Sequence, residues 1–338
     1  MSVWLPTSPC TPEACAGHEG RVASVPRAIL RLTGAVAVVL LGILGAQPVR
    51  LLPQRPRQAL VRAWATALIR AFGIRITVHG SPGPDGGRLI VANHISWLDI
   101  PLVAAVLPSR MLAKSDIRTW PVLGPLSRQN GTLFIERDRI RALPDTVETV
   151  ARALLGGDRV TVFPEGSTWC GRAQGPFRRA AFQSALDARV PVQPLRITYL
   201  LHGGHPAGAP AFVGDDPLAA SLWRIARARG VRAEVRLLPR IPPGRYTHRR
   251  DLAAAAQAAV VPVVPVAPVV PVAPVAPVAP VVPVVPEPAP APPSLPGIPS
   301  QPGPPSATDR DSAKRPSESV HHRVNSRPAA ESSFRTPS

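Results

Sequence analysis

Between residues 74 and 239, short apolar runs alternate with longer segments that are typical of helices. The apolar runs predict strands at 74–78, 89–92, 111–113, 132–135, 160–163, 192–198 and 233–237. The segments between them predict helices at 98–107, 121–128, 140–155, 178–188 and 218–229. Because strands that alternate with helices favour parallel pairing, we expect an α/β domain with a mainly parallel sheet and flanking helices.

An uncharged apolar run at 32–49 lies between Arg31 and Arg50 and predicts a membrane anchor helix over 27–50. Eighteen helical residues span about 27 Å, just short of the roughly 30 Å hydrocarbon core of a bilayer. A transmembrane helix, an interfacial or re-entrant anchor and an uncleaved signal-like segment all fit this run better than a buried core helix. Arginines are slightly more frequent after the run than before it, which favours a cytoplasmic position for the rest of the chain.

The following segment, 58–72, has Leu60, Trp64, Leu68 and Phe72 at intervals of four residues, with arginines around them. A basic amphipathic helix of this kind either packs on a domain or lies on a membrane surface. We expect the folded domain to span residues 51–245, a range that includes this segment.

Both ends of the chain lack this pattern. Residues 1–26 are rich in Pro, Ser, Thr and Gly without a period, so we expect them to be disordered. Residues 246–338 form a predicted Pro/Val/Ala-rich and disordered tail, in which nine prolines recur at every third position from 262 to 286. This period is typical of polyproline II. We interpret the tail as a stiff spacer, with a ligand for an aromatic groove as the alternative.

The net charge narrows the choice of partners. The 338 residues include 39 Lys and Arg against 21 Asp and Glu, a net charge of +18, and the last 52 residues contribute only +1 of it. A basic folded part suits a membrane surface, a phosphorylated small molecule or nucleic acid. We expect membrane lipids and no nucleic acid, because an apolar run precedes the domain and aromatic residues, at 4%, are too few for base stacking.

The three cysteines, Cys10, Cys15 and Cys170, are odd in number and irregularly spaced. This spacing excludes a small disulfide-stapled module and argues against a structural zinc site. The sequence therefore predicts no metal.

The segment 93–99, Asn-His-Ile-Ser-Trp-Leu-Asp, directly follows the strand predicted at 89–92. A polar residue at the end of a buried strand lies where open α/β sheets bind their ligands. If a helix begins near Ser96, Asp99 can fold back and accept a hydrogen bond from His94, whose other ring nitrogen is then a proton acceptor. The alternative is structural: Ser96 caps the helix, Asp99 favours its N-terminus and His94 is an incidental turn residue.

A second polar turn, 163–168, follows the strand predicted at 160–163 and reads Phe-Pro-Glu-Gly-Ser-Thr. Its backbone N–H groups and the hydroxyls of Ser167 and Thr168 can face an anionic ligand. In the alternative interpretation it is an ordinary turn with Glu165 in solvent.

Two further segments carry less chemistry. Residues 131–137 end in Arg137, which can contact a phosphate at the strand end or pair with a neighbouring carboxylate. Residues 190–195, Val-Pro-Val-Gln-Pro-Leu, contain no titratable group and by themselves predict core.

Taken in order, N-H-x-S-x-x-D, G-x-x-F-I-x-R, F-P-E-G-[ST] and V-P-V-x-P resemble the four motif blocks of the glycerolipid (lysophospholipid) acyltransferase family, over about residues 60–240. The resemblance implies a membrane-associated α/β domain that uses a fatty acyl thioester of CoA or acyl carrier protein, with no further cofactor. It also implies that His94 is the general base and that Asp99 orients it. By this resemblance, the residues that match the acceptor-binding block are Gly131, Phe134 and Arg137. The residues that match the block next to the acceptor head group are Phe163, Pro164, Glu165 and Gly166.

Thr168 departs from the family pattern. Many phosphatidate-forming members read E-G-T-R, whereas an E-G-T-T-like turn resembles enzymes that acylate lyso-ornithine lipids or other lysolipids. Other arginines, at 137, 172, 178 and 179, remain near in the sequence.

We therefore expect O-acyl transfer to 1-acyl-glycerol 3-phosphate, giving phosphatidate, on the cytoplasmic side of the cell membrane. Another lysolipid acceptor, such as lyso-ornithine lipid, is the alternative. A non-catalytic membrane-binding protein is a third hypothesis from another class, and it would have no need of the His94–Asp99 pair.

Overall fold

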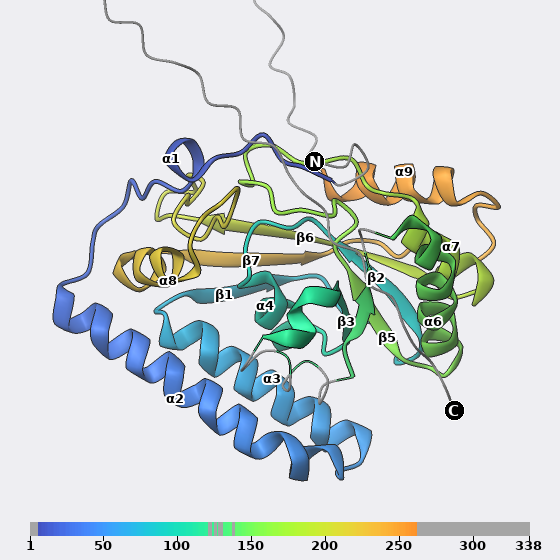
Figure 1. The fold of residues 1–338 in the computed structure, drawn as a ribbon, viewed down its shortest axis with the longest axis horizontal. Helices are drawn as coiled ribbons and strands as arrows, with labels where there is room; N and C mark the ends of the chain where they lie inside the picture. Colours follow the sequence, from blue (N-terminus) through green and yellow to red (C-terminus); the bar gives the residue numbers. More distant parts are fainter. Residues whose placement is uncertain (1–5, 121–123, 125–126, 128–130, 137–138, 262–338) are drawn as a thin grey trace, which may run out of the picture. The chain divides into compact units, whose positions relative to one another are not determined.

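The computed structural model describes residues 6–120, 124, 127, 131–136 and 139–261. Within them, one sheet has the strand order β1-β7-β6-β2-β5-β3-β4 (Figure 1). Its strands are β1 (Arg75–His79), β2 (Arg88–Ala92), β3 (Arg110–Lys114), β4 (Leu133–Ile135), β5 (Arg159–Val162), β6 (Val192–Leu200) and β7 (Arg232–Leu237). Every strand predicted from the apolar runs is present, which confirms the expected α/β class.

The sheet is mainly parallel, as expected: β6 and β7 pair antiparallel, and the other strand pairs are parallel. The central strand β2 is buried on both faces. Leu89 and Val91 belong to one apolar core and Ile90 and Ala92 to the other. A strand covered on both faces needs no alternation of polar and apolar residues, which explains its continuous apolar run.

Helices cover both faces of the sheet (Figure 1). The core that contains Ile90 also receives side chains from α2 (Val25–Arg50), α3 (Gln54–Ala71), α4 (Asp99–Val106) and α8 (Leu218–Arg227). The core that contains Leu89 receives side chains from α6 (Leu143–Leu155), α7 (Ala180–Asp187) and α9 (Arg249–Val260). Shorter helical segments are α1 (Pro12–Cys15), η1 (Ser115–Thr119) and η2 (Ile140–Ala142). The helix predicted at 121–128 lies largely outside the described residues.

Helix α2 corresponds to the predicted anchor and is long and apolar enough to cross a membrane. Small residues, Ala28 and Ala35, face the core, whereas Leu30, Leu41 and Leu44 are each more than 60% exposed. A helix that buries its small residues and exposes its large apolar ones presents a hydrophobic surface that can contact a membrane or a protein partner. This exposure agrees with membrane association of the protein.

Helix α3 is the amphipathic segment, and it packs on the domain. Ala65, Leu68 and Ile69 are buried in the core, and the indole nitrogen of Trp64 donates a hydrogen bond of 2.8 Å to the carbonyl of Val38 in α2. The two helices therefore lie side by side (Figure 1).

The structure differs from the sequence-based boundaries at both ends. Residues 6–24, expected to be disordered, lie on the domain: Cys10 and Ala23 are buried, and the Ala23 N–H donates to the carbonyl of Arg227 at 2.7 Å. This N-terminal segment is held by individual contacts with the surface of the domain. For this reason its own sequence needs no periodic pattern of hydrophobic residues.

Helix α9 falls inside the expected tail and extends the folded part at least to Val260. Leu252, Ala253, Ala256 and Val260 are buried against the sheet. The guanidinium group of Arg196 in β6 donates to the last carbonyls of the helix, at 2.9 Å to Ala259. The proline repeat lies outside the described residues.

We predict that a chain ending after Val261 keeps the melting temperature of the full chain. A chain ending after Arg245 should lose more than about 3 kcal/mol of stability, since even one buried Leu→Ala change costs roughly 2–5 kcal/mol. It also leaves the Arg196 charge without its carbonyl partners. Thermal unfolding of both purified chains in the same detergent measures the difference. Equal melting temperatures would contradict the assignment of α9 to the fold.

Candidate active site

The candidate site begins where β2 ends. The side chain of Asn93 is bound to the neighbouring strand β6 through both of its polar atoms: Nδ2 donates to the carbonyl of Ile197 at 2.9 Å, and Oδ1 accepts from the Ile197 N–H at 2.8 Å. The side chain of Asn93 thus takes the place of a backbone hydrogen-bonding partner for β6. This fixes the direction in which the next residue, His94, leaves the sheet.

The carboxylate of Asp99, at the start of α4, accepts four hydrogen bonds and is fully buried. Oδ2 accepts from Nδ1 of His94 at 2.9 Å and from the N–H groups of Ile95 at 2.6 Å and Ser96 at 2.8 Å. Oδ1 accepts from the hydroxyl of Tyr199 at 2.7 Å. The predicted pair is therefore formed. Of the structural alternative, Asp99 does lie in the first turn of α4, but Ser96 does not cap the helix, whose N-cap is Leu98 without a side-chain hydrogen bond.

The geometry assigns the proton of His94. An ionised carboxylate only accepts hydrogen bonds, so Nδ1 carries the hydrogen that points to Asp99 and Nε2 has a free lone pair. The imidazole stacks on Phe163, with ring centroids 4.1 Å apart and an interplanar angle of 15°. The His94 side chain is 17% exposed, so the ring is accessible yet held on two sides.

Glu165 is not in solvent, as the alternative interpretation of its turn had it, but is 2% exposed. Its Oε2 accepts from the N–H of His94 at 2.7 Å, and its Oε1 accepts from the N–H of Gly175 at 3.2 Å. Burial raises the pKa of Glu165 from 4.5 to about 8, against the lowering effect of these two N–H groups and with a further increase from the charge of Asp99. Glu165 therefore connects the His94 turn to the loop after β5.

The rest of the 163–168 turn is compact. The N–H of Gly166 donates to the carbonyl of Phe163 at 3.1 Å, and Gly166 has a φ of +77°, which favours glycine. The N–H of Arg178 donates to the carbonyl of Pro164 at 2.8 Å. Among the described residues the buried hydroxyl oxygen of Ser167 has no hydrogen-bond partner.

Two contacts complete the surroundings of this turn. Thr168 is half-buried, and after it the N–H of Trp169 donates to the carbonyl of His94 at 2.7 Å. On the other side, Pro6 of the N-terminal segment lies directly against Gly166. The turn and the His94 segment thus form one hydrogen-bonded unit that the N-terminal segment partly covers.

The expected acceptor-binding block lies on the edge strand. Strand β4 is separated from β2 by β5 and β3, which places it about 14 Å away at the usual strand spacing. The carbonyl of Gly131 accepts from Nε of Arg110 at 2.6 Å, and the guanidinium of Arg118 lies 4.9 Å from the ring centre of Phe134. Arg137 lies outside the described residues. The structure thus brings His94, Asp99 and the 163–168 turn together and keeps Gly131 and Phe134 at a distance.

Two residues that contact the predicted site residues, Tyr199 and Arg118, were not identified from the sequence. Tyr199 is far from Asp99 in the sequence. Within the apolar run of β6, nothing in the sequence distinguishes it from an ordinary core aromatic residue. Burial, followed by the charge and the hydrogen-bonding of Asp99, raises the pKa of Tyr199 well above its usual value, so its hydroxyl remains a donor. Arg118 follows β3 in a segment that carries no recognisable motif.

Comparison with known proteins identifies the family. Residues 75–198 match the family described as Acyltransferase. The chain is 37% identical over 238 residues to the lyso-ornithine lipid O-acyltransferase of Pseudomonas aeruginosa, which covers 68% of this chain and 91% of that protein. The chain belongs to the glycerolipid acyltransferase family. It is an enzyme that transfers acyl groups, as its resemblance to this family implied.

Further relatives agree with this assignment. The acyltransferase is 36% identical over 183 residues to the 1-acyl-sn-glycerol-3-phosphate acyltransferase of Neisseria gonorrhoeae, covering 54% of this chain and 71% of that one. Its fold matches the crystal structure of the 1-acyl-sn-glycerophosphate acyltransferase PlsC from Thermotoga maritima, with a TM-score of 0.53 and 20% identity over 70% of this chain and 93% of that chain.

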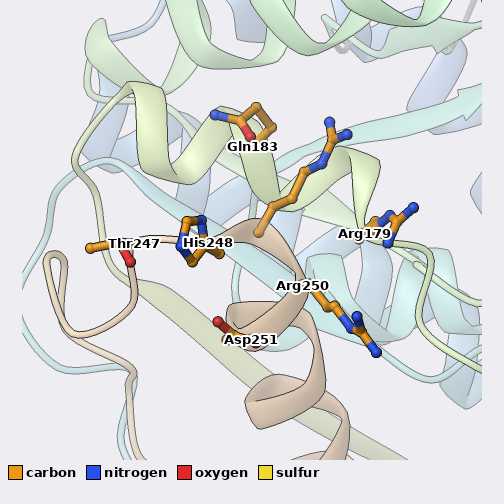
Figure 2. A pocket seen from close by; sticks show the side chains of 7 residues that line it. Arg179, Gln183, Thr247, His248, Arg250 and Asp251 are labelled. Carbon is orange, nitrogen blue, oxygen red and sulfur yellow. The ribbon is translucent and has the colours of Figure 1, made fainter.

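A separate surface hollow of about 740 Å³ lies between α7 and α9 of the acyltransferase (Figure 2). Arg179 and Gln183 line it from one side, and residues 247–251 line it from the other. None of the candidate catalytic residues borders it, and its lining residues are largely exposed. This hollow is therefore separate from the candidate active site.

The raised pKa of Glu165 predicts a pH-dependent stability of the acyltransferase. Because the folded protein holds this proton more tightly than the unfolded chain, the contribution is fully present below about pH 4.5 and is lost as the pH rises through about 8. From pH 5 to 9, the melting temperature of the native enzyme should fall relative to that of Glu165→Gln, which cannot titrate.

The exposed Glu136 provides the matched control for this experiment. Its Glu136→Gln variant should follow the native curve at every pH. If Glu165→Gln also follows the native curve, Glu165 does not titrate in this range.

Proposed function

We propose that the enzyme transfers a fatty acyl group from an acyl thioester to the free hydroxyl of a lysolipid, with His94 as the general base. One observation carries this proposal: the buried Asp99 carboxylate orients Nδ1 of His94 and leaves Nε2 with a lone pair. A membrane-binding protein without catalysis would have no use for a histidine held in this way.

The reaction can be followed proton by proton. Nε2 of His94 takes the proton of the acceptor hydroxyl as its oxygen attacks the thioester carbonyl carbon. The new C–O bond forms, the C–S bond breaks when the tetrahedral intermediate collapses, and the imidazolium returns its proton to the departing thiolate. The carboxylate of Asp99 stabilises the imidazolium between these two steps. No covalent acyl-enzyme is needed, because the thiolate is a good leaving group.

The donor in this proposal is acyl-CoA or acyl carrier protein, and the substrates meet at a membrane. The exposed leucines of α2 provide an apolar surface beside the domain, and the positive net charge suits an anionic cytoplasmic leaflet. We therefore propose that the catalytic domain acts on the cytoplasmic side of the cell membrane.

For the acceptor we propose 1-acyl-glycerol 3-phosphate, with phosphatidate as the product. The backbone of Arg178 is bound to Pro164, so its exposed side chain begins beside the 163–168 turn and can supply the cation that Thr168 does not. Arg118 lies next to Phe134 on the edge strand and so is at a distance from this turn. The gonococcal relative, named for this acceptor, supports the same choice.

Lyso-ornithine lipid is the second candidate acceptor, and Thr168 favours it. A zwitterionic head group has less need of a cation at this position than a phosphate monoester has. The relative from Pseudomonas aeruginosa, which aligns along 91% of its length, is named for this acceptor.

We predict that His94→Ala abolishes acyl transfer in membranes that contain the protein. Asp99→Asn should lower turnover by orders of magnitude while changing donor affinity little, because it disturbs the imidazole and not the acyl-chain contacts. The matched control is His248→Ala, a change of an exposed histidine at the separate hollow. Near-normal turnover by a folded His94→Ala variant would refute the catalytic role.

Thr168→Arg separates the two acceptors. If lysophosphatidate is the acceptor, the native enzyme uses it, and the new cation leaves its apparent KM unchanged or lowers it by up to about 10- to 150-fold, the range of a charge-assisted contact. Turnover with lysophosphatidate and with lyso-ornithine lipid is measured side by side. Thr247→Arg, which adds the same charge at an exposed position elsewhere, controls for bulk electrostatics.

The opposite result identifies the other acceptor. If the native enzyme acylates only lyso-ornithine lipid and turnover of lysophosphatidate appears only in Thr168→Arg, the proposal of a phosphate acceptor is wrong.

A further inference from the structure

The three cysteines of the chain come together in the folded protein. The sulfur atoms of Cys10, Cys15 and Cys170 all lie within 4.8 Å of one another, and the three thiols are free. Cys10 and Cys15 belong to the N-terminal segment, and Cys170 follows the 163–168 turn. Their spacing in the sequence argued against a metal site, but the fold removes this objection.

The backbone around the cysteines is ordered by local hydrogen bonds. The N–H of Cys10 donates to Oγ of Ser8 at 3.2 Å, and the N–H of Cys15 donates to the carbonyl of Thr11 at 3.0 Å. Thr11 also caps α1, which ends at Cys15. The two N-terminal thiols are therefore held on one compact turn, and Cys10 and Cys170 are each less than 9% exposed.

The distances suit one ion of the size of a first-row metal. Three sulfurs bound at about 2.3 Å in a trigonal plane lie about 4.0 Å apart, so closing the site from the observed spacing needs only a small movement. Among the described residues, the group of potential ligands contains these three thiols and no histidine or carboxylate. Zinc in structural sites takes four ligands, whereas soft thiolates also select copper(I).

We propose that Cys10, Cys15 and Cys170 bind one soft metal ion of the copper(I) type. Binding forms metal–sulfur bonds and releases the thiol protons to solvent, with no change of oxidation state. It also connects the N-terminal segment to the loop next to the active site. Pro6 lies against Gly166, and the neighbour of Cys170, Trp169, is bound to His94, so the ion would fasten the segment that partly covers this turn.

The first experiment titrates the reduced full-length protein in detergent, under argon, with copper(I) in competition with a chromophoric copper(I) chelator. We expect one copper per chain in the native protein. Cys10→Ser, Cys15→Ser and Cys170→Ser should each weaken binding by more than about tenfold, because even loss of a group that only supports a ligand costs 10- to 100-fold. Thr11→Ser, which keeps the cap of α1, is the matched control and should bind like the native protein.

A second readout follows the N-terminal segment itself. Copper(I) should slow tryptic cleavage at the exposed Arg21 in the native protein and in Thr11→Ser, but not in Cys15→Ser. Equal cleavage with and without copper in the native protein would show that the ion does not fasten the segment.

A third measurement needs no variant and so does not depend on variant folding. Cadmium(II), a soft ion without redox chemistry, should give the native protein a thiolate-to-metal charge-transfer absorption that saturates at one ion per chain. Absence of this band, copper affinity equal to that of the serine variants, or loss of two thiols to a disulfide in air without any copper binding would each overturn the proposal.

Discussion

The buried carboxylate of Asp99 is the group on which the arrangement of the site depends. Two backbone N–H groups, the His94 imidazole and the Tyr199 hydroxyl all donate to it, and they come from the turn after β2 and from β6. A buried carboxylate without such partners would be costly. The same carboxylate that these four hydrogen bonds satisfy also orients the imidazole, so the folded turn itself positions His94.

Glu165 plays the corresponding part for the loop after β5. It binds the N–H of His94 with one oxygen and the N–H of Gly175 with the other, so the 163–168 turn cannot move away from the histidine without leaving polar groups unpaired. Its raised pKa is a consequence of this buried position. The two buried carboxyl groups thus have separate tasks: Asp99 orients the ring, and Glu165 holds the neighbouring loop against it.

The sequence predicted most of the framework because the framework depends on local patterns. The seven strands were visible as apolar runs, and the His94–Asp99 pair was recognisable because both members lie on one turn. Tyr199 and the cysteine cluster were not, since they depend on segments that only the fold brings together. Helix α9 was assigned to the tail because the proline repeat directly follows it, although its alanine-rich sequence is a good helix former.

The order of the strands places the residues proposed for catalysis and those expected to bind the acceptor at different positions along the sheet. The proposed base, His94, lies at the end of the central strand β2, whereas Phe134 and its neighbour Arg118 lie at the edge of the sheet, with two strands in between. The imidazole meets only a hydroxyl, which every lysolipid acceptor offers. Under this proposal, we expect head-group selection to depend on charges at the ends of other strands and on the turn that carries Thr168. The two acceptors for which relatives are named, lyso-ornithine lipid and 1-acyl-sn-glycerol 3-phosphate, differ in this head group, so under the proposal a cation gained or lost beside the turn should shift the preference between them.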